Sequence, residues 1–247
     1  MLKVKGLSVS YGKQKVLSGL DFEIERGSMT AIIGRNGSGK STLLSALSGA
    51  LECSGEILLD GRPLHEIPRA ERAKKIAFLP QIMPSPQITV RELVSLGRSP
   101  YTGLSGRMGK GDAEAVEKAI DRVGISHVAD KRADKISGGE LRLSYLAMIL
   151  AQDTEIILLD EPSAFMDIAN ERRMCQILQE LKETEGKTVT VAMHSLSAAV
   201  SFADRVLITD RGNLAFCGTR DACLEAEIIE KNFTVTKHTD GESVWFE

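Results

Sequence analysis

The segment Gly34 to Ser41 most constrains what this chain can fold into. It reads Gly-Arg-Asn-Gly-Ser-Gly-Lys-Ser and fits the pattern G-x-x-x-x-G-K-[ST]. An apolar run, Met29 to Ile33, precedes it, and a stretch with helical periodicity, Thr42 to Leu51, follows it. A strand, a glycine-rich loop and a helix in this order can cradle a phosphate, because backbone N–H groups and the helix N-terminus then face the anion. The motif therefore predicts a nucleotide-binding α/β protein.

Each part of this loop has an expected role. Lys40 adds a mobile positive charge for the terminal phosphates, and the hydroxyl of Ser41 can hold Mg²⁺. The alternative interpretation is a glycine-rich turn without a ligand. The residues that we expect to bind the nucleotide here are Gly34, Asn36, Gly37, Ser38, Gly39, Lys40, Ser41 and Thr42.

Composition narrows the classes of partner. The chain has 247 residues, with 31 basic and 34 acidic side chains and a formal charge of -3, so its charge implies no broad attraction to nucleic acid or anionic lipid. Its four cysteines lack metal-ligand spacing, and the first 25 residues lack a signal-peptide core, which indicates reduced thiols in the cytosol. No apolar run is long enough to cross a bilayer, so we expect any membrane role to come from a partner.

The hydrophobic pattern divides the chain into strand-rich and helix-rich parts. Three strand-like segments surround the phosphate loop in sequence: Leu2 to Leu7, Leu20 to Glu25 and Gly55 to Asp60. Continuous apolar runs at 76–79, 155–159, 189–192 and 206–208 are typical of buried strands in a parallel sheet. Between them, helical patterns at 90–96, 113–123 and 139–152 predict an inserted helical lobe. A glycine-rich stretch at 97–111 interrupts this pattern, and we expect a surface loop around Gly103, Gly106, Gly109 and Gly111.

Two adjacent carboxylates, Asp160 and Glu161, follow the buried run Ile156 to Leu159. The carboxyl end of such a strand is where open α/β sheets bind ligands. Asp160 is expected to act on the Mg²⁺ near Ser41, directly or through water, and Glu161 to align a water for attack on the terminal phosphate. The alternative is an acid pair that only caps the next helix.

Ile136 to Glu140 resembles the L-S-G-G-Q signature of ABC ATPases, and it lies about 20 residues before Asp160. The resemblance extends from Leu2 to about Gly218. It implies that Ser137, Gly138 and Gly139 contact the γ-phosphate of an ATP held by a second copy of the chain. A serine hydroxyl and glycine amides at a helix N-terminus suit this task, although an ordinary helix cap is the alternative.

The family also implies a fold. It is an α/β fold with a phosphate-loop, RecA-like parallel sheet core, an N-terminal antiparallel β subdomain and an inserted α-helical subdomain. On this chain of 1–247, we place the ATP-binding core with its β subdomain at 1–84 and 154–247, and the helical signature subdomain at 85–153.

Further positions match residues of the family in order. Tyr11 resembles the aromatic that stacks on adenine, with Val16 beside it, and Gln81 resembles the glutamine that touches Mg²⁺ and water while linking the two lobes. His194 matches the histidine that contacts the γ-phosphate, and Asp167 matches the aspartate that crosses the dimer interface. For each residue alone, a structural or solvated role is the alternative. The resemblance implies that Glu161, His194, Gln81 and Lys40 are catalytic, and that Ser41, Gln81 and Asp160 hold the metal.

The chain also departs from the family pattern. The signature ends in Glu140 rather than glutamine, Leu141-Arg142-Leu143 replaces a basic or polar run, and Phe165-Met166 replaces the usual residues before Asp167. The sequence assigns no role to His65, His127, His238 or the last 29 residues.

Three stretches are similar to the ATPases of bacterial importers for iron(III)-siderophores, haem and cobalamin: Gly97 to Tyr101, Ala147 to Gln152, and Leu159 to Pro162 with Asp167-Ile168. Such a subunit uses ATP and Mg²⁺ and dimerises around two nucleotides. It binds membrane permease subunits, here through residues 82–101, at the cytoplasmic face of the membrane, and a substrate-binding protein feeds the permease. A soluble ABC ATPase for cofactor assembly or DNA repair and a non-ABC phosphate-loop kinase are the alternatives. The transported solute is not specified, because this subunit is not expected to touch it.

Overall fold

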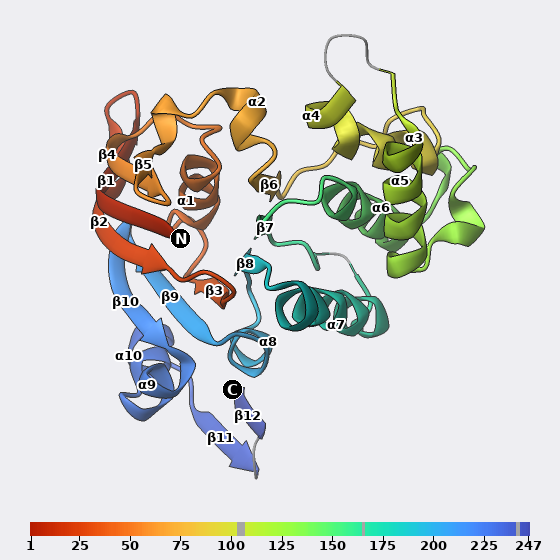
Figure 1. The fold of residues 1–247 in the computed structure, drawn as a ribbon. Helices are drawn as coiled ribbons and strands as arrows, with labels where there is room; N and C mark the ends of the chain where they lie inside the picture. The colour runs from red at the N-terminus through yellow and green to blue at the C-terminus, as the bar shows by residue number, and fades with distance from the viewer. Residues whose placement is uncertain (103–106, 165, 241–242) are drawn as a thin grey trace.

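A six-stranded sheet runs through the centre of the molecule in the order β10-β9-β3-β8-β7-β6 (Figure 1). The computed structural model describes residues 1–102, 107–164, 166–240 and 243–247. Neighbouring strands from β9 to β6 pair in parallel, and β10 adds an antiparallel edge. All positions of β3, β7 and β8 are buried, which explains their continuous apolar sequences. The strands are β3 (Met29–Ile33), β6 (Ile76–Leu79), β7 (Ile156–Asp160), β8 (Thr188–Ala192), β9 (Arg205–Asp210) and β10 (Asn213–Thr219).

A second, antiparallel sheet has the order β2-β1-β4-β5. Helix α1 (Lys40–Leu47) packs between the two sheets, because Leu43, Leu44 and Leu47 share one buried cluster with side chains from both. The helix that follows the phosphate loop is therefore fixed on two sides. The strands of this sheet are β1 (Leu2–Tyr11), β2 (Gln14–Ile24), β4 (Ser54–Leu59) and β5 (Arg62–Pro63).

A separate helical lobe lies beside the central sheet (Figure 1). Its helices are α3 (Val90–Ser95), α4 (Ser99–Thr102), α5 (Lys110–Val123) and α6 (Gly138–Ala151). In α5, Val116, Ala119, Ile120 and Val123 are buried at helical spacing, and they belong to the same core cluster as the apolar side chains of α3 and α6. The lobe is thus held by the apolar faces of α3, α5 and α6.

The remaining helices cover the sheet and the C-terminal end. Helix α7 (Ile168–Glu185) follows β7, α8 (Leu196–Phe202) follows β8, and α2 (Arg69–Arg72) precedes β6. After β10 come α9 (Arg220–Glu225), α10 (Ile228–Phe233) and a hairpin of β11 (Lys237–Asp240) and β12 (Ser243–Phe246). The hairpin lies against α8, where the Phe246 N–H donates to Ser197 Oγ at 3.0 Å.

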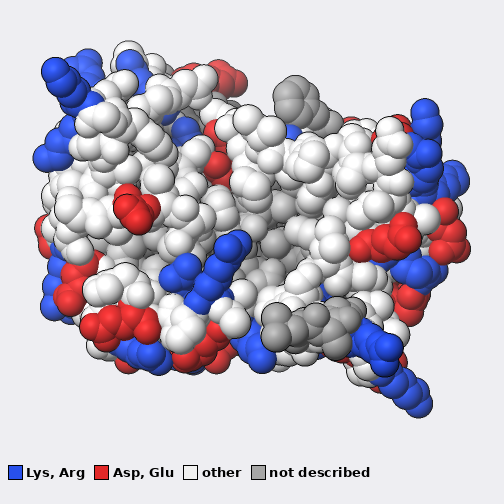
Figure 2. Space-filling model, turned by 90° about the horizontal axis from the view of Figure 1, so that it is seen from above, with Lys and Arg blue, Asp and Glu red and all other residues white. Residues whose placement is uncertain are grey.

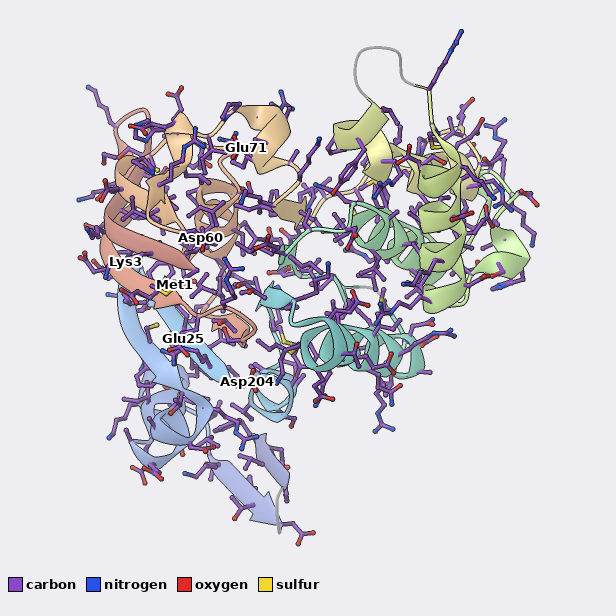
Figure 3. All side chains as sticks on the ribbon, viewed as in Figure 1. Met1, Lys3, Glu25, Asp60, Glu71 and Asp204 are labelled. Carbon is purple, nitrogen blue, oxygen red and sulfur yellow. The ribbon has the colours of Figure 1, made fainter. Side chains whose placement is uncertain are left out.

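Ion pairs join neighbouring elements at the surface, and Figure 3 labels Met1, Asp60 and Asp204 among their members. The terminal amine of Met1 lies 2.6 Å from Asp60 Oδ1, and Lys182 Nζ lies 2.8 Å from Asp204 Oδ1. Asp204 also accepts the backbone N–H of Met29 at 2.9 Å. Exposed pairs of this kind contribute little each, so the buried clusters carry most of the stability.

The α/β fold class predicted from the sequence is confirmed, with its parallel-rich core sheet, antiparallel β subdomain and helical lobe. The subdomain boundaries near residues 85 and 153 stay predictions. Across the described ranges, no helix is both long enough and apolar enough to span a membrane.

Two local predictions were wrong. Helix α1 ends at Leu47 instead of Leu51, because Gly49 adopts a φ of +71° and turns the chain away. The predicted interruption of helical structure from Gly97 is also wrong at its start, since 96–98 form a 3-10 turn that continues into α4. Arg98 anchors it, with Nε 2.9 Å from Asp112 Oδ1 and the guanidinium 3.9 Å above the Tyr101 ring. The predicted loop residues 103–106 lie outside the described residues.

Gly97 allows this turn to lie directly against α6. A Cβ at this position would lie 2.1 Å from the backbone oxygen of Met148, and backbone cannot move aside as a flexible side chain can. We expect Gly97→Ala to lower the free energy of unfolding by about 1–3 kcal/mol in chemical denaturation. The matched control is Gly111→Ala in α5, where a Cβ meets nothing within 4 Å. It should leave stability unchanged or raise it by up to about 1 kcal/mol. Equal effects of the two changes would contradict the close packing of Gly97.

Candidate functional site

The phosphate loop connects β3 to α1, and its shape depends on glycine. A Cβ on Gly34 would lie 2.4 Å from Ser38 Oγ and 2.5 Å from the Thr209 carbonyl oxygen. Gly37 and Gly39 have φ angles of +77° and +102°, which other residues rarely adopt. Ser38 Oγ hydrogen-bonds Thr209 Oγ1 at 2.8 Å and fixes the loop to β9. The glycines and the Ser38–Thr209 hydrogen bond together set the shape of the loop.

Lys40 lies in the first turn of α1 and is only 4% exposed. Its ammonium donates to the Gly34 carbonyl at 2.9 Å, within the loop. Burial lowers the pKa of Lys40, while the nearby charges of Glu161 and Asp160 act in the opposite direction. The ammonium is therefore held where it can meet a phosphate group.

Asp160 ends β7 and is 2% exposed. Burial raises the pKa of its carboxyl, and a hydrogen bond from Ser41 and the charge of Lys40 counteract this effect. Its Oδ1 atom is buried and has no hydrogen-bond partner within the described part of the chain. An unsatisfied carboxylate oxygen next to a hydroxyl suits a hard cation such as Mg²⁺, which usually takes one or two protein oxygens together with phosphate oxygens.

Glu161 follows at once in a left-handed conformation, with a φ of +49° and 7% exposure. Its N–H donates to the Ala192 carbonyl at 3.1 Å, which ties it to β8. Its carboxylate contacts two of the predicted residues, since Oε1 lies 2.6 Å from His194 Nε2 and Oε2 accepts a hydrogen bond from Gln81 Nε2. These contacts aim the carboxylate into the space in front of the phosphate loop.

One cleft brings most of the predicted residues together. It opens at the carboxyl edge of the central sheet, between the loop, the end of β7 and the segments after β6 and β8. The side chains of Glu161, Lys40 and His194 and the glycine-rich loop thus line the same space. Phosphoryl chemistry requires charged groups and donors that converge in this way. The lining residues are Val16, Asn36, Gly37, Ser38, Gly39, Lys40, Ser41, Thr42, Gln81, Glu161 and His194.

The predicted signature residues lie at the N-terminus of α6. Ser137 is the N-cap, and its Oγ accepts the N–H of Glu140 at 3.2 Å. Gly138 and Gly139 form the first turn, so their N–H groups have no helical partner. A Cβ on Gly138 would meet nothing within 4 Å, which leaves this turn open to a ligand. The contact of this turn with a second copy stays a prediction.

The roles of Tyr11 and Asp167 also stay predictions. Tyr11 ends β1 and is 54% exposed, so its ring is available for stacking. Asp167 caps α7 by accepting the Asn170 N–H at 2.7 Å. This structural role is compatible with the predicted contact across the dimer interface.

Sequence reasoning missed two side chains near the site. Thr209 hydrogen-bonds Ser38 of the phosphate loop, and no local motif marks this residue. Arg142, noted only as a departure from the family pattern, donates through one guanidinium nitrogen to the Glu161 carbonyl oxygen at 3.3 Å. No local sequence pattern marks this contact, because Arg142 lies on α6 and Glu161 follows β7, 19 residues further along the chain.

The chain is similar to known proteins along most of its length. The family model described as ABC transporter matches residues 17–164. The chain is 39% identical over 232 residues to the ferric enterobactin transport ATP-binding protein FepC of Escherichia coli (strain K12), which covers 93% of this chain and 86% of the relative. It is 32% identical over 236 residues to the iron(3+)-hydroxamate import ATP-binding protein FhuC of Bacillus subtilis (strain 168), covering 95% and 88%.

The chain is also similar to a cassette whose structure was solved as a dimer. The dimeric structure of the bacterial ABC transporter cassette MJ0796 superposes with a TM-score of 0.79 and 26% identity, covering 89% of this chain and 99% of that one. The same cassette has been solved as a dimer in a post-hydrolysis state with ADP and Pi.

The burial of Lys40 next to the loop gives a direct test. We expect Lys40→Ala to weaken ATP binding by at least about tenfold, because a charge-assisted hydrogen bond to the phosphates is lost. Titration with a fluorescent ATP analogue measures this affinity. Lys15→Ala, at an exposed position of β2, is the control and should bind as the parent does. Unchanged affinity in Lys40→Ala would exclude the proposed cradle.

Proposed function

This chain belongs to the ABC transporter family, and from that premise we propose that it is the ATP-hydrolysing subunit of an importer for a metal chelate. The observation that carries the proposal is the single cleft in which the phosphate loop, Glu161, Gln81 and His194 converge. The relatives support the cargo class, because FepC is named for ferric enterobactin and FhuC for iron(3+)-hydroxamate.

Within one chain, the proposed work is divided among the residues of the cleft. The loop amides and Lys40 bind the β- and γ-phosphates, and Tyr11 with Val16 holds the adenine. Glu161 accepts a proton from the attacking water, which His194 and Gln81 help to position. The contacts from Glu161 to His194 and Gln81 support this arrangement, because both partners already face the same carboxylate.

Mg²⁺ is proposed to bind between Ser41 and Asp160, with Gln81 as a further oxygen ligand. The unsatisfied, buried Oδ1 atom of Asp160 supports this placement. When bound, the ion neutralises phosphate charge during hydrolysis.

Two copies are proposed to enclose two ATP molecules, each held by the loop of one chain and by Ser137, Gly138 and Gly139 of the other. The dimeric cassette MJ0796 supports such an assembly. Asp167 would lie at the interface between the two copies. ATP then joins the subunits, and hydrolysis at Glu161 releases them.

The permease is proposed to bind on the face that carries α2 and α4, at the top of Figure 1. Figure 2 shows this face, which is hollowed between the two lobes and largely uncharged in the hollow. Large apolar side chains are exposed in the segment 82–101, namely Ile82 at 86%, Leu96 at 53% and Tyr101 at 37%. Such side chains favour a protein partner. The chain would then lie at the cytoplasmic face of the membrane, and a substrate-binding protein would serve the permease from the other side.

The alternatives explain less. The hypothesis of a phosphate-loop kinase does not account for the exposed turn at Ser137. A soluble ABC ATPase for cofactor assembly or DNA repair shares the site, but the relatives reported above are transport subunits.

Glu161→Gln tests the chemistry. The amide keeps the shape of the side chain but cannot accept the proton, so hydrolysis should fall by about 10²-fold or more. ATP binding should remain, and an ATP-bound dimer should accumulate in size-exclusion chromatography. Glu183→Gln, an exposed position of α7, should hydrolyse ATP as the parent does. Normal turnover in Glu161→Gln would exclude the general base.

Leu96→Asp tests the permease surface. A charge in a desolvated contact should reduce membrane association by about tenfold or more when the permease is coexpressed, as measured by cosedimentation. Gln176→Asp on α7 places the same charge at another exposed site and should cosediment normally. Melting temperatures show that both variants are folded. Undiminished membrane association of Leu96→Asp would place the permease elsewhere.

A further inference from the structure

Two residues without an assigned role meet beside the signature turn. His127 lies in a 3-10 turn at Ser126–Val128, and its Nε2 atom is 3.0 Å from Oε1 of Glu140. Glu140 is the residue that replaces the usual glutamine of the signature. The histidine side chain is 64% exposed and the glutamate 28%. The pair therefore stands at the edge of the surface that is proposed to face a second copy.

The other carboxylate oxygen of Glu140 is engaged with Ser137. Its Oε2 atom accepts the Ser137 hydroxyl at 2.7 Å and the Ser137 backbone N–H at 2.8 Å. These two hydrogen bonds, and then the contact with His127, hold the pKa of the Glu140 carboxyl below its usual value. Glu140 is thus an anion near neutral pH, and it uses the only proton that the Ser137 hydroxyl has.

This arrangement conflicts with the binding of ATP across a dimer. A serine hydroxyl donates one hydrogen bond, so Ser137 must release Glu140 before it can donate to the γ-phosphate of the other copy. The carboxylate would then lose a donor and face a phosphate of the same sign. A glutamine at this position would create neither problem, because its amide is neutral and a weaker acceptor.

We propose that His127 is a positioning residue of the site shared between two copies. Its Nε2–H donates a hydrogen bond to the free oxygen of the Glu140 carboxylate and so holds this side chain in place when the Ser137 hydroxyl turns to the γ-phosphate of ATP bound to the other chain. The inference rests on the proposed nucleotide-sandwich dimer. It makes His127 necessary only because residue 140 is an acid.

A double-mutant cycle separates this role from a structural one. The parent carries Glu161→Gln, so that ATP is bound and not consumed, and four chains are compared: the parent, His127→Ala, Glu140→Gln and the combination. Analytical ultracentrifugation gives the ATP concentration at which half of each chain is dimeric. His65→Ala is the matched control, because His65 is also an exposed histidine in a 3-10 turn, Leu64–Glu66.

We expect His127→Ala to raise the half-dimer ATP concentration by about threefold to fivefold, the range of one hydrogen bond at a partly exposed site. In chains that also carry Glu140→Gln, the same change should shift it by less than about twofold, since no carboxylate remains for His127 to hold. His65→Ala should cause no shift. ATP affinity of the monomer, measured below the dimerisation range, should be equal in all chains.

Two results overturn the inference alone: no shift from His127→Ala in the parent, or the same shift with and without Glu140→Gln. A parent that stays monomeric at saturating ATP overturns the proposed dimer, and the role of His127 falls with it.

Discussion

The buried carboxylate of Glu161 joins segments that are far apart in the sequence. Its backbone is held by Ala192 and Arg142, and its side chain by Gln81 and His194. A left-handed conformation at a non-glycine residue is unfavourable by itself and persists only where the surroundings fix it. The fold supplies these surroundings, because β6, β7 and β8 are adjacent parallel strands whose carboxyl ends meet at one edge.

Other buried charged side chains lie close to Glu161. Two buried acids, Asp160 and Glu161, lie near one buried base, Lys40. ATP would bring further negative charge, and the proposed Mg²⁺ would offset part of it.

The sequence was sufficient to predict the parts of the candidate site that are encoded in contiguous residues. The phosphate loop and the acid pair have fixed spacing, and the alternation of buried strands and helices predicted the sheet that brings them together. It was insufficient where a role depends on contacts between distant residues. The pairing of His127 with Glu140, the bond from Arg142 to the Glu161 carbonyl and the support of Ser38 by Thr209 have no local pattern. The helical turn at 97–102 was missed for the same reason, since α6 and Asp112 stabilise a stretch whose glycine suggests a loop.

The central claim is that one chain cannot complete its own ATP site. The most direct test is the ATPase rate per chain as a function of protein concentration, from well below to well above the range in which dimers form. The account predicts that the specific activity rises with concentration and levels off once dimers predominate. A specific activity that is the same at every dilution, down to solutions that contain only monomers, would contradict it.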